Sequence, residues 1–110
     1  MITKEQILIF KKSADTLYAT KDYTSASILY FKTWFAIQDF ILIEKTGRSP
    51  KDHTERFRML EKEFPSSYTQ LDREFSTYRD TYSKVVGKLD CDRIKGIIEN
   101  ELKINSIKKD

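Results

Sequence analysis

Residues that interrupt or crosslink a chain are scarce in this sequence of 110 residues. It contains three glycines, two prolines, one cysteine and one histidine. A single cysteine excludes an intramolecular disulfide, and one cysteine with one histidine cannot build a His/Cys metal site. Few glycines and prolines leave long uninterrupted segments, which favour helix over strand. The sequence therefore predicts a helical protein that uses no metal and no other cofactor.

A strong charge of one sign and a long apolar run are also missing. Twenty basic residues stand against seventeen acidic ones, and a net charge of +3 is too small to indicate a nucleic-acid-binding protein. The apolar stretches Ile28–Phe31, Trp34–Ile37 and Phe40–Ile43 are separated by polar pairs, so this segment is a poor membrane span. No apolar signal region follows the first five residues. We therefore expect a cytoplasmic protein that does not contact a membrane.

Five segments repeat their apolar residues at helical spacing, and none alternates with the period of a strand. The expected helices run from about Lys4 to Thr20, Ser25 to Thr46, Pro50 to Phe64, Ser67 to Val86 and Cys91 to Ile104. Short connections between helices favour antiparallel neighbours. The sequence thus predicts one all-α domain over residues 1–110, an up-and-down antiparallel bundle of about five helices, with residues 105–110 as a frayed tail.

Polar residues and glycines suggest where these helices begin and end. Gly47 is expected to end the second helix in a left-handed conformation. The expected start signals are, in chain order, Thr3 with Gln6 as a capping box, Thr24 or Ser25, Pro50 at the first helical position, Ser67 with Gln70 as a second capping box, and Asp90.

The second predicted helix is apolar around most of its circumference, which is typical of a central helix with neighbours on several sides. Its polar residues Ser25, Lys32 and Asp39 fall on one narrow line. In the third predicted helix, His53 heads the stripe that continues through Phe57. We therefore expect the His53 ring to pack inward and to form a hydrogen bond across helices.

An ordered series of residues extends over most of the chain. The pair Asp22-Tyr23 precedes a long helix with small and aromatic residues, and Gly47 and a Pro-Lys-x-His sequence follow. This series resembles the HEPN family of archaeal and bacterial helical domains over about residues 5–102. The other matching positions are Ala26, Tyr30, Ala36, Leu42, Pro50, Lys51, His53 and the segment from Tyr78 to Tyr82.

The resemblance implies a helical bundle that pairs into a homodimer. In one branch of the family it implies ribonuclease activity. In a second branch it implies partnership with a small nucleotidyltransferase in toxin–antitoxin pairs, and in a third it implies nucleotide binding without RNA cleavage.

The nuclease branch uses an arginine followed, after four to six residues, by a histidine, and Arg48 and His53 match that spacing. His53 could act as general acid or base on a ribose 2′-hydroxyl, and Arg48 could hold the phosphate. In the family this motif usually lies on a late helix, and the fifth predicted helix here has no histidine. A packing role for His53 is the alternative.

Two further groups of residues could bind a ligand. Arg48, Lys51, His53 and Arg56 surround the start of the third predicted helix, where free backbone N–H groups favour a phosphate or nucleotide. A solvated face is the alternative, because acidic residues are interleaved there. The other group could stack RNA bases or form a core or dimer seam; it comprises Tyr68, Arg73, Phe75, Tyr78, Arg79 and Tyr82. The thiol of Cys91 is expected to be buried and structural.

Three functions remain open on the sequence alone. The preferred hypothesis is a non-catalytic, homodimeric HEPN-like interaction module whose partner is a small nucleotidyltransferase or a nucleotide. The alternative is a metal-independent HEPN endoribonuclease that uses Arg48 and His53 on RNA. A bare helical scaffold is the third.

Overall fold

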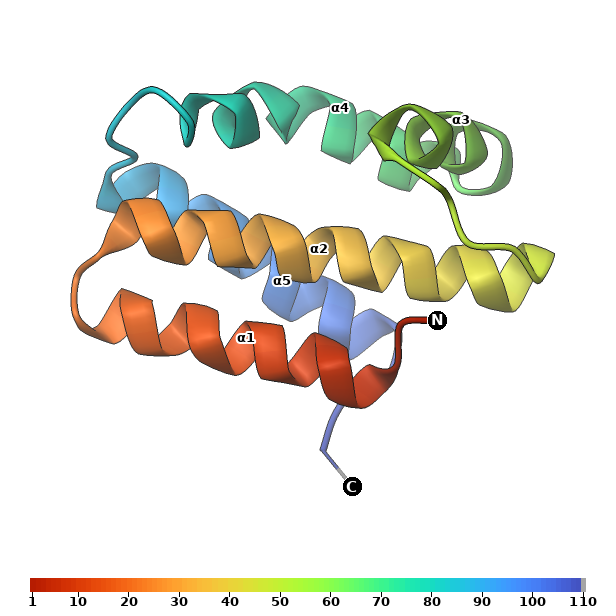
Figure 1. The fold of residues 1–110 in the computed structure, drawn as a ribbon, viewed down its shortest axis with the longest axis horizontal. Helices are drawn as coiled ribbons and strands as arrows, with labels where there is room; N and C mark the ends of the chain where they lie inside the picture. Colours follow the sequence, from red (N-terminus) through yellow and green to blue (C-terminus); the bar gives the residue numbers. More distant parts are fainter. Residues whose placement is uncertain (110) are drawn as a thin grey trace.

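The computed structural model describes residues 1–109 and contains five α-helices joined by short connections (Figure 1). They are α1 (Lys4–Ala19), α2 (Tyr23–Thr46), α3 (His53–Glu63), α4 (Pro65–Asp80) and α5 (Lys88–Ile104). No strand occurs in the described part of the chain. The prediction of an all-α bundle of about five helices is confirmed.

Helix α2 lies at the centre of the bundle and contacts each of the other four helices. In Figure 1, α1 runs antiparallel to α2 on one side, and α5 crosses behind them both. On the opposite side, α4 runs antiparallel to α2, and α3 lies crosswise at the end of α4. The bundle therefore has two layers, with α1, α2 and α5 in one and α3 and α4 in the other.

The burial of α2 explains its composition. Eleven of its 24 residues are buried, and they point to all sides of the helix. By length and composition α2 is also apolar enough to cross a bilayer, with a mean hydropathy of 1.3 over its most apolar window, but 61% of that window is buried inside the protein. The apolar surface of α2 is thus used to pack the other helices.

Two of the residue signals predicted for helix ends are confirmed. The Gln6 backbone N–H donates to Thr3 Oγ1 at 3.2 Å, and the Thr3 N–H donates to Gln6 Oε1 at 2.9 Å, which is a capping box. Gly47 has a φ of 76°, and its N–H donates to the Ile43 carbonyl at 2.8 Å. These local signals place the start of α1 and the end of α2.

The predicted starts of the next two helices are wrong, because aspartates cap them. Asp22 accepts from the Ser25 N–H at 3.1 Å, so α2 begins at Tyr23. Thr24 instead bonds the Val86 N–H at 2.9 Å, outside any cap. Asp52 accepts from the Glu55 N–H at 2.8 Å and starts α3 at His53. Pro50 therefore lies in the α2–α3 connection, where it is buried.

The predicted limits of α4 and the predicted start of α5 also differ from the structure, whereas α5 ends at Ile104 as predicted. Helix α4 begins at Pro65, directly after Phe64 ends α3, so Ser67 and Gln70 lie inside it rather than at its cap. It ends at Asp80 instead of Val86. Gly87 precedes α5, and Asp90 lies in the first turn of that helix.

The chain stays packed beyond the expected end of order at Ile104. Ser106 has a φ of 54°, and the Ile107 N–H donates to the Leu102 carbonyl at 2.9 Å. The Ile107 side chain is 3% exposed. Fraying is therefore not seen at Ile107, whereas Lys108 and Lys109 are exposed, and residue 110, the end of the predicted tail, lies outside the described residues.

Candidate functional site

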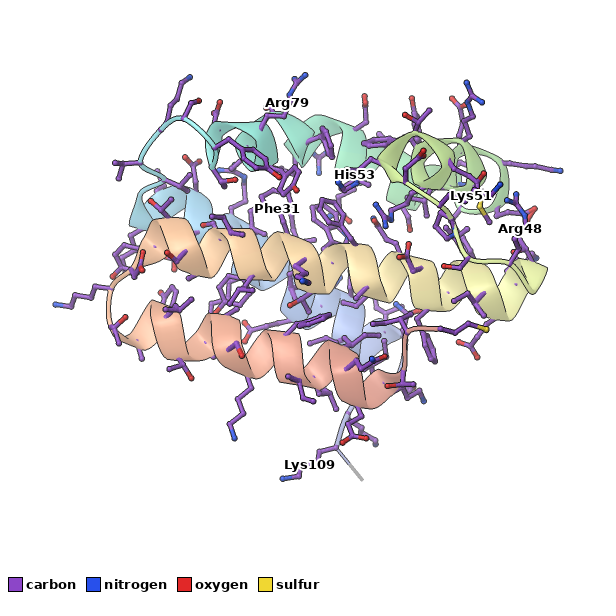
Figure 2. All side chains as sticks on the ribbon, in the orientation of Figure 1. Phe31, Arg48, Lys51, His53, Arg79 and Lys109 are labelled. Atoms are coloured by element: carbon purple, nitrogen blue, oxygen red, sulfur yellow. The ribbon has the colours of Figure 1, made fainter. Side chains whose placement is uncertain are left out.

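The only histidine of the sequence lies in an aromatic layer between α2 and the α3–α4 pair. The His53 ring centroid lies 4.7 Å from that of Phe35 on α2. It lies 5.5 Å from Phe75 and 5.6 Å from Tyr78, both on α4. Figure 2 shows His53 pointing into the space between α2 and α4. The structure thus places the ring inward, as expected from the stripe of α3.

His53 belongs to a hydrogen-bonded chain that crosses from α3 to α2. Arg56 Nη1 lies 2.6 Å from His53 Nδ1. The Arg56 guanidinium also donates to both carboxylate oxygens of Asp39, from Nε at 2.7 Å and from Nη2 at 3.0 Å. The hydrogen bond of His53 is therefore to its own helix, which corrects the expected bond across helices, and Arg56 makes the link to α2.

This chain restricts the chemistry of the imidazole. Because Arg56 only donates, Nδ1 must accept, which assigns the proton of the neutral ring to Nε2. Burial, and then the charge of Arg56, lower the pKa of His53 from its usual 6.5, while Asp39 and Asp52 oppose that shift. At neutral pH the ring is thus uncharged, and neither nitrogen offers a free lone pair. It cannot take up a proton as a general base without losing its bond to Arg56.

Arg48 lies apart from His53. Its side chain is 58% exposed, and Nη1 donates to Glu55 Oε1 at 2.8 Å. Glu55 also accepts from the Lys51 backbone N–H at 3.1 Å. In Figure 2, Arg48 lies at the outer end of the α2–α3 connection, whereas His53 lies inside the bundle. The structure does not bring together the two residues of the predicted nuclease pair.

Ion pairs within the fold occupy two of the cations that were predicted to bind an anion. Arg56 is 8% exposed, pairs with Asp39 and lies 5.0 Å over the Phe35 ring. The guanidinium of Arg48 pairs with Glu55. Two of the four predicted ligand-binding residues thus have carboxylate partners. Lys51 is exposed near the start of α3, and His53 faces the aromatic layer.

The aromatic residues of α4 are mostly occupied by packing. Phe75 and Tyr78 contact Phe35, with ring centroids 6.3 and 5.0 Å away. Burial, helped by a hydrogen bond between its hydroxyl group and that of Tyr82, raises the pKa of Tyr78 to about 12. Tyr82 itself is 76% exposed. The core interpretation therefore describes Phe75 and Tyr78, whereas Tyr82, which lies beyond the end of α4, is mostly exposed.

Sequence reasoning missed the two ion pairs that join α3 to α2 and α4 to α5. The first is the pair of Asp39 with Arg56. Asp39 was identified in the sequence only as one of the polar positions of α2, although an acidic residue on a largely apolar helix indicates a buried partner. Glu74 is 6% exposed and accepts from Arg93 Nε of α5 at 2.9 Å. Nothing in the helical periodicity of α4 or α5 indicates that second pair.

Three exposed apolar side chains follow one another in the connection between α4 and α5 and in the first turn of α5. Tyr82 is 76%, Val85 92% and Leu89 83% exposed. The lysines beside them are paired within the chain, Lys84 with Asp80 at 3.5 Å and Lys88 with Asp92 at 2.7 Å. We call Tyr82, Val85 and Leu89 the connection patch.

Among residues 1–109, no group of three or more His, Cys, Asp or Glu side chains is placed to hold a metal ion. Comparisons of the chain with models of protein families, with curated proteins and with solved structures find no match.

Proposed function

We propose that this chain is a non-catalytic helical interaction module that works as a homodimer. The observation that carries the proposal is the connection patch, three large apolar side chains that are each more than three-quarters exposed. Large apolar side chains that gather on a surface mark sites of association. Tyr82 touches the edge of the His53 layer through Tyr78, with ring centroids 5.5 Å apart, whereas Val85 and Leu89 are almost fully exposed to solvent.

A second copy of the chain suits this patch better than a strongly charged partner. A two-fold interface places the same surface on both sides, so an unbalanced charge would repel its own copy. Here Lys84 and Lys88 are each neutralised by an aspartate one turn away. The patch is therefore apolar at its centre and electrically balanced at its rim.

The contacts of His53 support the non-catalytic part of the proposal. Its lone pair is used by Arg56, its pKa is lowered, and Arg48 is bonded elsewhere. The HEPN resemblance supplies the proposed partner class, a small nucleotidyltransferase of the toxin–antitoxin type or a nucleotide. The competing proposal is the metal-independent endoribonuclease, which needs Arg48 and His53 to act together.

Sedimentation velocity at micromolar concentration tests the dimer. We expect a species of about twice the 13.0 kDa chain mass for the wild type and a monomer for Val85→Asp, because a buried carboxylate would oppose association. Ile104→Asp is the matched control, since Ile104 is 66% exposed but lies at the far end of α5. A monomeric wild type would rule out the homodimer.

Digestion of single-stranded RNA in the absence of metal tests the non-catalytic reading. Wild type, Arg48→Ala and His53→Ala should all leave the RNA intact. If the wild type cuts RNA and both variants are folded but inactive, the chain is a ribonuclease and the proposal is wrong.

A further inference from the structure

A groove of about 580 Å³ runs along the N-terminal half of α1 beside the end of the chain. Figure 2 shows Lys109 below α1, on the side away from α2. Its lining comes from two segments that are far apart in the sequence: Lys4, Glu5, Leu8, Ile9, Lys12, Lys108 and Lys109. The packing of Ile107 against the bundle brings the second segment to α1.

The groove combines an apolar floor with a basic rim. Leu8 is partly buried, and Ile9 is 53% exposed although it lies in the middle of a helix. Four lysines line the groove against one described carboxylate, that of Glu5.

The rim lysines are available to a ligand. Within residues 1–109, none of the four lysines forms an ion pair. Lys4 Nζ is held at the rim by the Ser106 carbonyl at 3.5 Å and lies 5.9 Å over the Phe40 ring. Outside the groove, the exposed lysines Lys84 and Lys88 have an aspartate partner one turn away, so their charges are less available to a ligand.

We propose that this groove binds an acidic amphipathic helix of a partner protein. Charge complementarity identifies the occupant, because an apolar stripe flanked by carboxylates would cover Leu8 and Ile9 and reach the ammonium groups on both sides. A nucleic acid would satisfy the lysines but would leave Ile9 facing phosphate and sugar. This inference goes beyond the proposed homodimer and does not depend on it, since the connection patch lies in the α4–α5 connection and at the start of α5.

The spacing of the lysines sets the register of the partner. Lys4, Leu8 and Lys12 lie four residues apart on one face of α1, so the two lysines are separated by about 12 Å along the helix. A helix packed alongside α1 would match them with acids seven or eight residues apart and an apolar residue between. The groove volume is in the range of concave binding sites and suits one or two apolar anchors rather than a whole helix.

A designed peptide provides the probe. We suggest a fluorescein-labelled peptide of about 18 residues, five helical turns, with one leucine stripe and glutamates eight positions apart on either side of it. The control peptide has lysines in place of those glutamates. Fluorescence anisotropy should show saturable binding of the acidic peptide, no binding of the basic one, and weaker binding as salt is raised.

Paired charge reversals locate the binding to the groove. Lys12→Glu with Lys109→Glu should weaken binding of the acidic peptide about tenfold, because two attractions become repulsions. Lys45→Glu with Lys62→Glu makes the same change in net charge on exposed helix ends outside the groove, and should leave the affinity unchanged. Circular dichroism would verify that both double variants are folded.

Three results would overturn the proposal: equal binding of the acidic and basic peptides, equal weakening by both double variants, or no binding at all. If dodecanoate binds in the groove while the acidic peptide does not, the groove takes a small anionic amphiphile and the proposal is also wrong. Val85→Asp should keep full peptide binding, so a failed dimer and a failed groove are distinguished.

Discussion

Arg56 and Asp39 join α3 to α2 through a bidentate ion pair, with N–O distances of 2.7 and 3.0 Å. The two side chains are 10% and 19% exposed. A third donor of the guanidinium, on Nη1, reaches His53. Because each of the three groups uses another as its partner, removing one leaves a charge or a polar atom without a partner in a largely dry layer.

Asp39→Ala should therefore destabilise the protein by about 3 kcal/mol, because it leaves the Arg56 charge without its carboxylate. The double variant Asp39→Leu with Arg56→Met should cost less than Asp39→Ala, since it removes both charges and leaves apolar groups. Urea unfolding followed by circular dichroism measures these differences.

Asp80→Ala is the control for that experiment. It removes an exposed ion pair with Lys84, whose side chain is 69% exposed, and should change the free energy of unfolding by less than about 0.5 kcal/mol. Equal costs for Asp39→Ala and Asp80→Ala would show that the α2–α3 pair adds nothing beyond a surface contact.

Replacing His53 should affect stability more than replacing Arg48. His53→Ala removes a ring packed between Phe35 and Phe75 and deprives Arg56 Nη1 of its acceptor, at a cost of about 2 kcal/mol. Arg48→Ala removes one exposed pair with Glu55, at a cost below about 0.5 kcal/mol. A thermal melt of each variant compares them, and a larger loss for Arg48→Ala would contradict the inward packing of His53.

Lowering the pH should destabilise the folded protein through protonation of His53. Its pKa is lowered in the folded protein from the usual 6.5, mainly by burial, so the unfolded chain takes up the proton more readily. The contribution of His53 is fully present above pH 6.5 and is lost as the pH falls through the folded pKa. We expect the melting temperature of the wild type to fall from about pH 7.5 to about pH 5, and to fall less in His53→Gln. Parallel pH profiles of the two proteins would exclude this residue as the cause.

Replacing glycine by alanine should have opposite effects on stability at Gly47 and at Gly96. Gly47→Ala should lower the free energy of unfolding by about 1 kcal/mol. The reason is that φ is 76° there, and an L side chain is strained at this φ even with no atom near its Cβ. Gly96→Ala should raise the free energy of unfolding by about 0.5–1 kcal/mol, since Gly96 lies inside α5 with open space around the added methyl group. Chemical denaturation gives both values, and the same sign at both sites would contradict the helix end at Gly47.

Local signals in the sequence predicted most of the fold but little of the site. The Thr3 capping box and Gly47 act through neighbouring backbone groups, so they could be identified without knowing what packs around them. The end of α4 could not, because Tyr82 and Val85 continue the apolar spacing although the structure leaves both exposed. Periodicity shows which residues share a face, but not whether another element covers it.

The charged contacts were harder to foresee for a related reason. Asp39 and Arg56 are 17 residues apart and on different helices, so their pairing depends on how α3 is placed against α2. A cluster of cations around the start of α3 predicted a ligand site, yet acids within the fold neutralise two of them, Arg48 and Arg56.

The two-layer arrangement also bears on how the protein fluctuates. The α3–α4 pair has no linker between its helices other than Phe64, and it is held to the rest by the aromatic layer and by the pairs of Arg56 with Asp39 and of Glu74 with Arg93. Such a segment can open as one cooperative unit while α1, α2 and α5 stay folded. Amide hydrogen exchange would then give α3 and α4 a common, lower protection than the three other helices, and an opened α3–α4 pair would expose the aromatic face of α2.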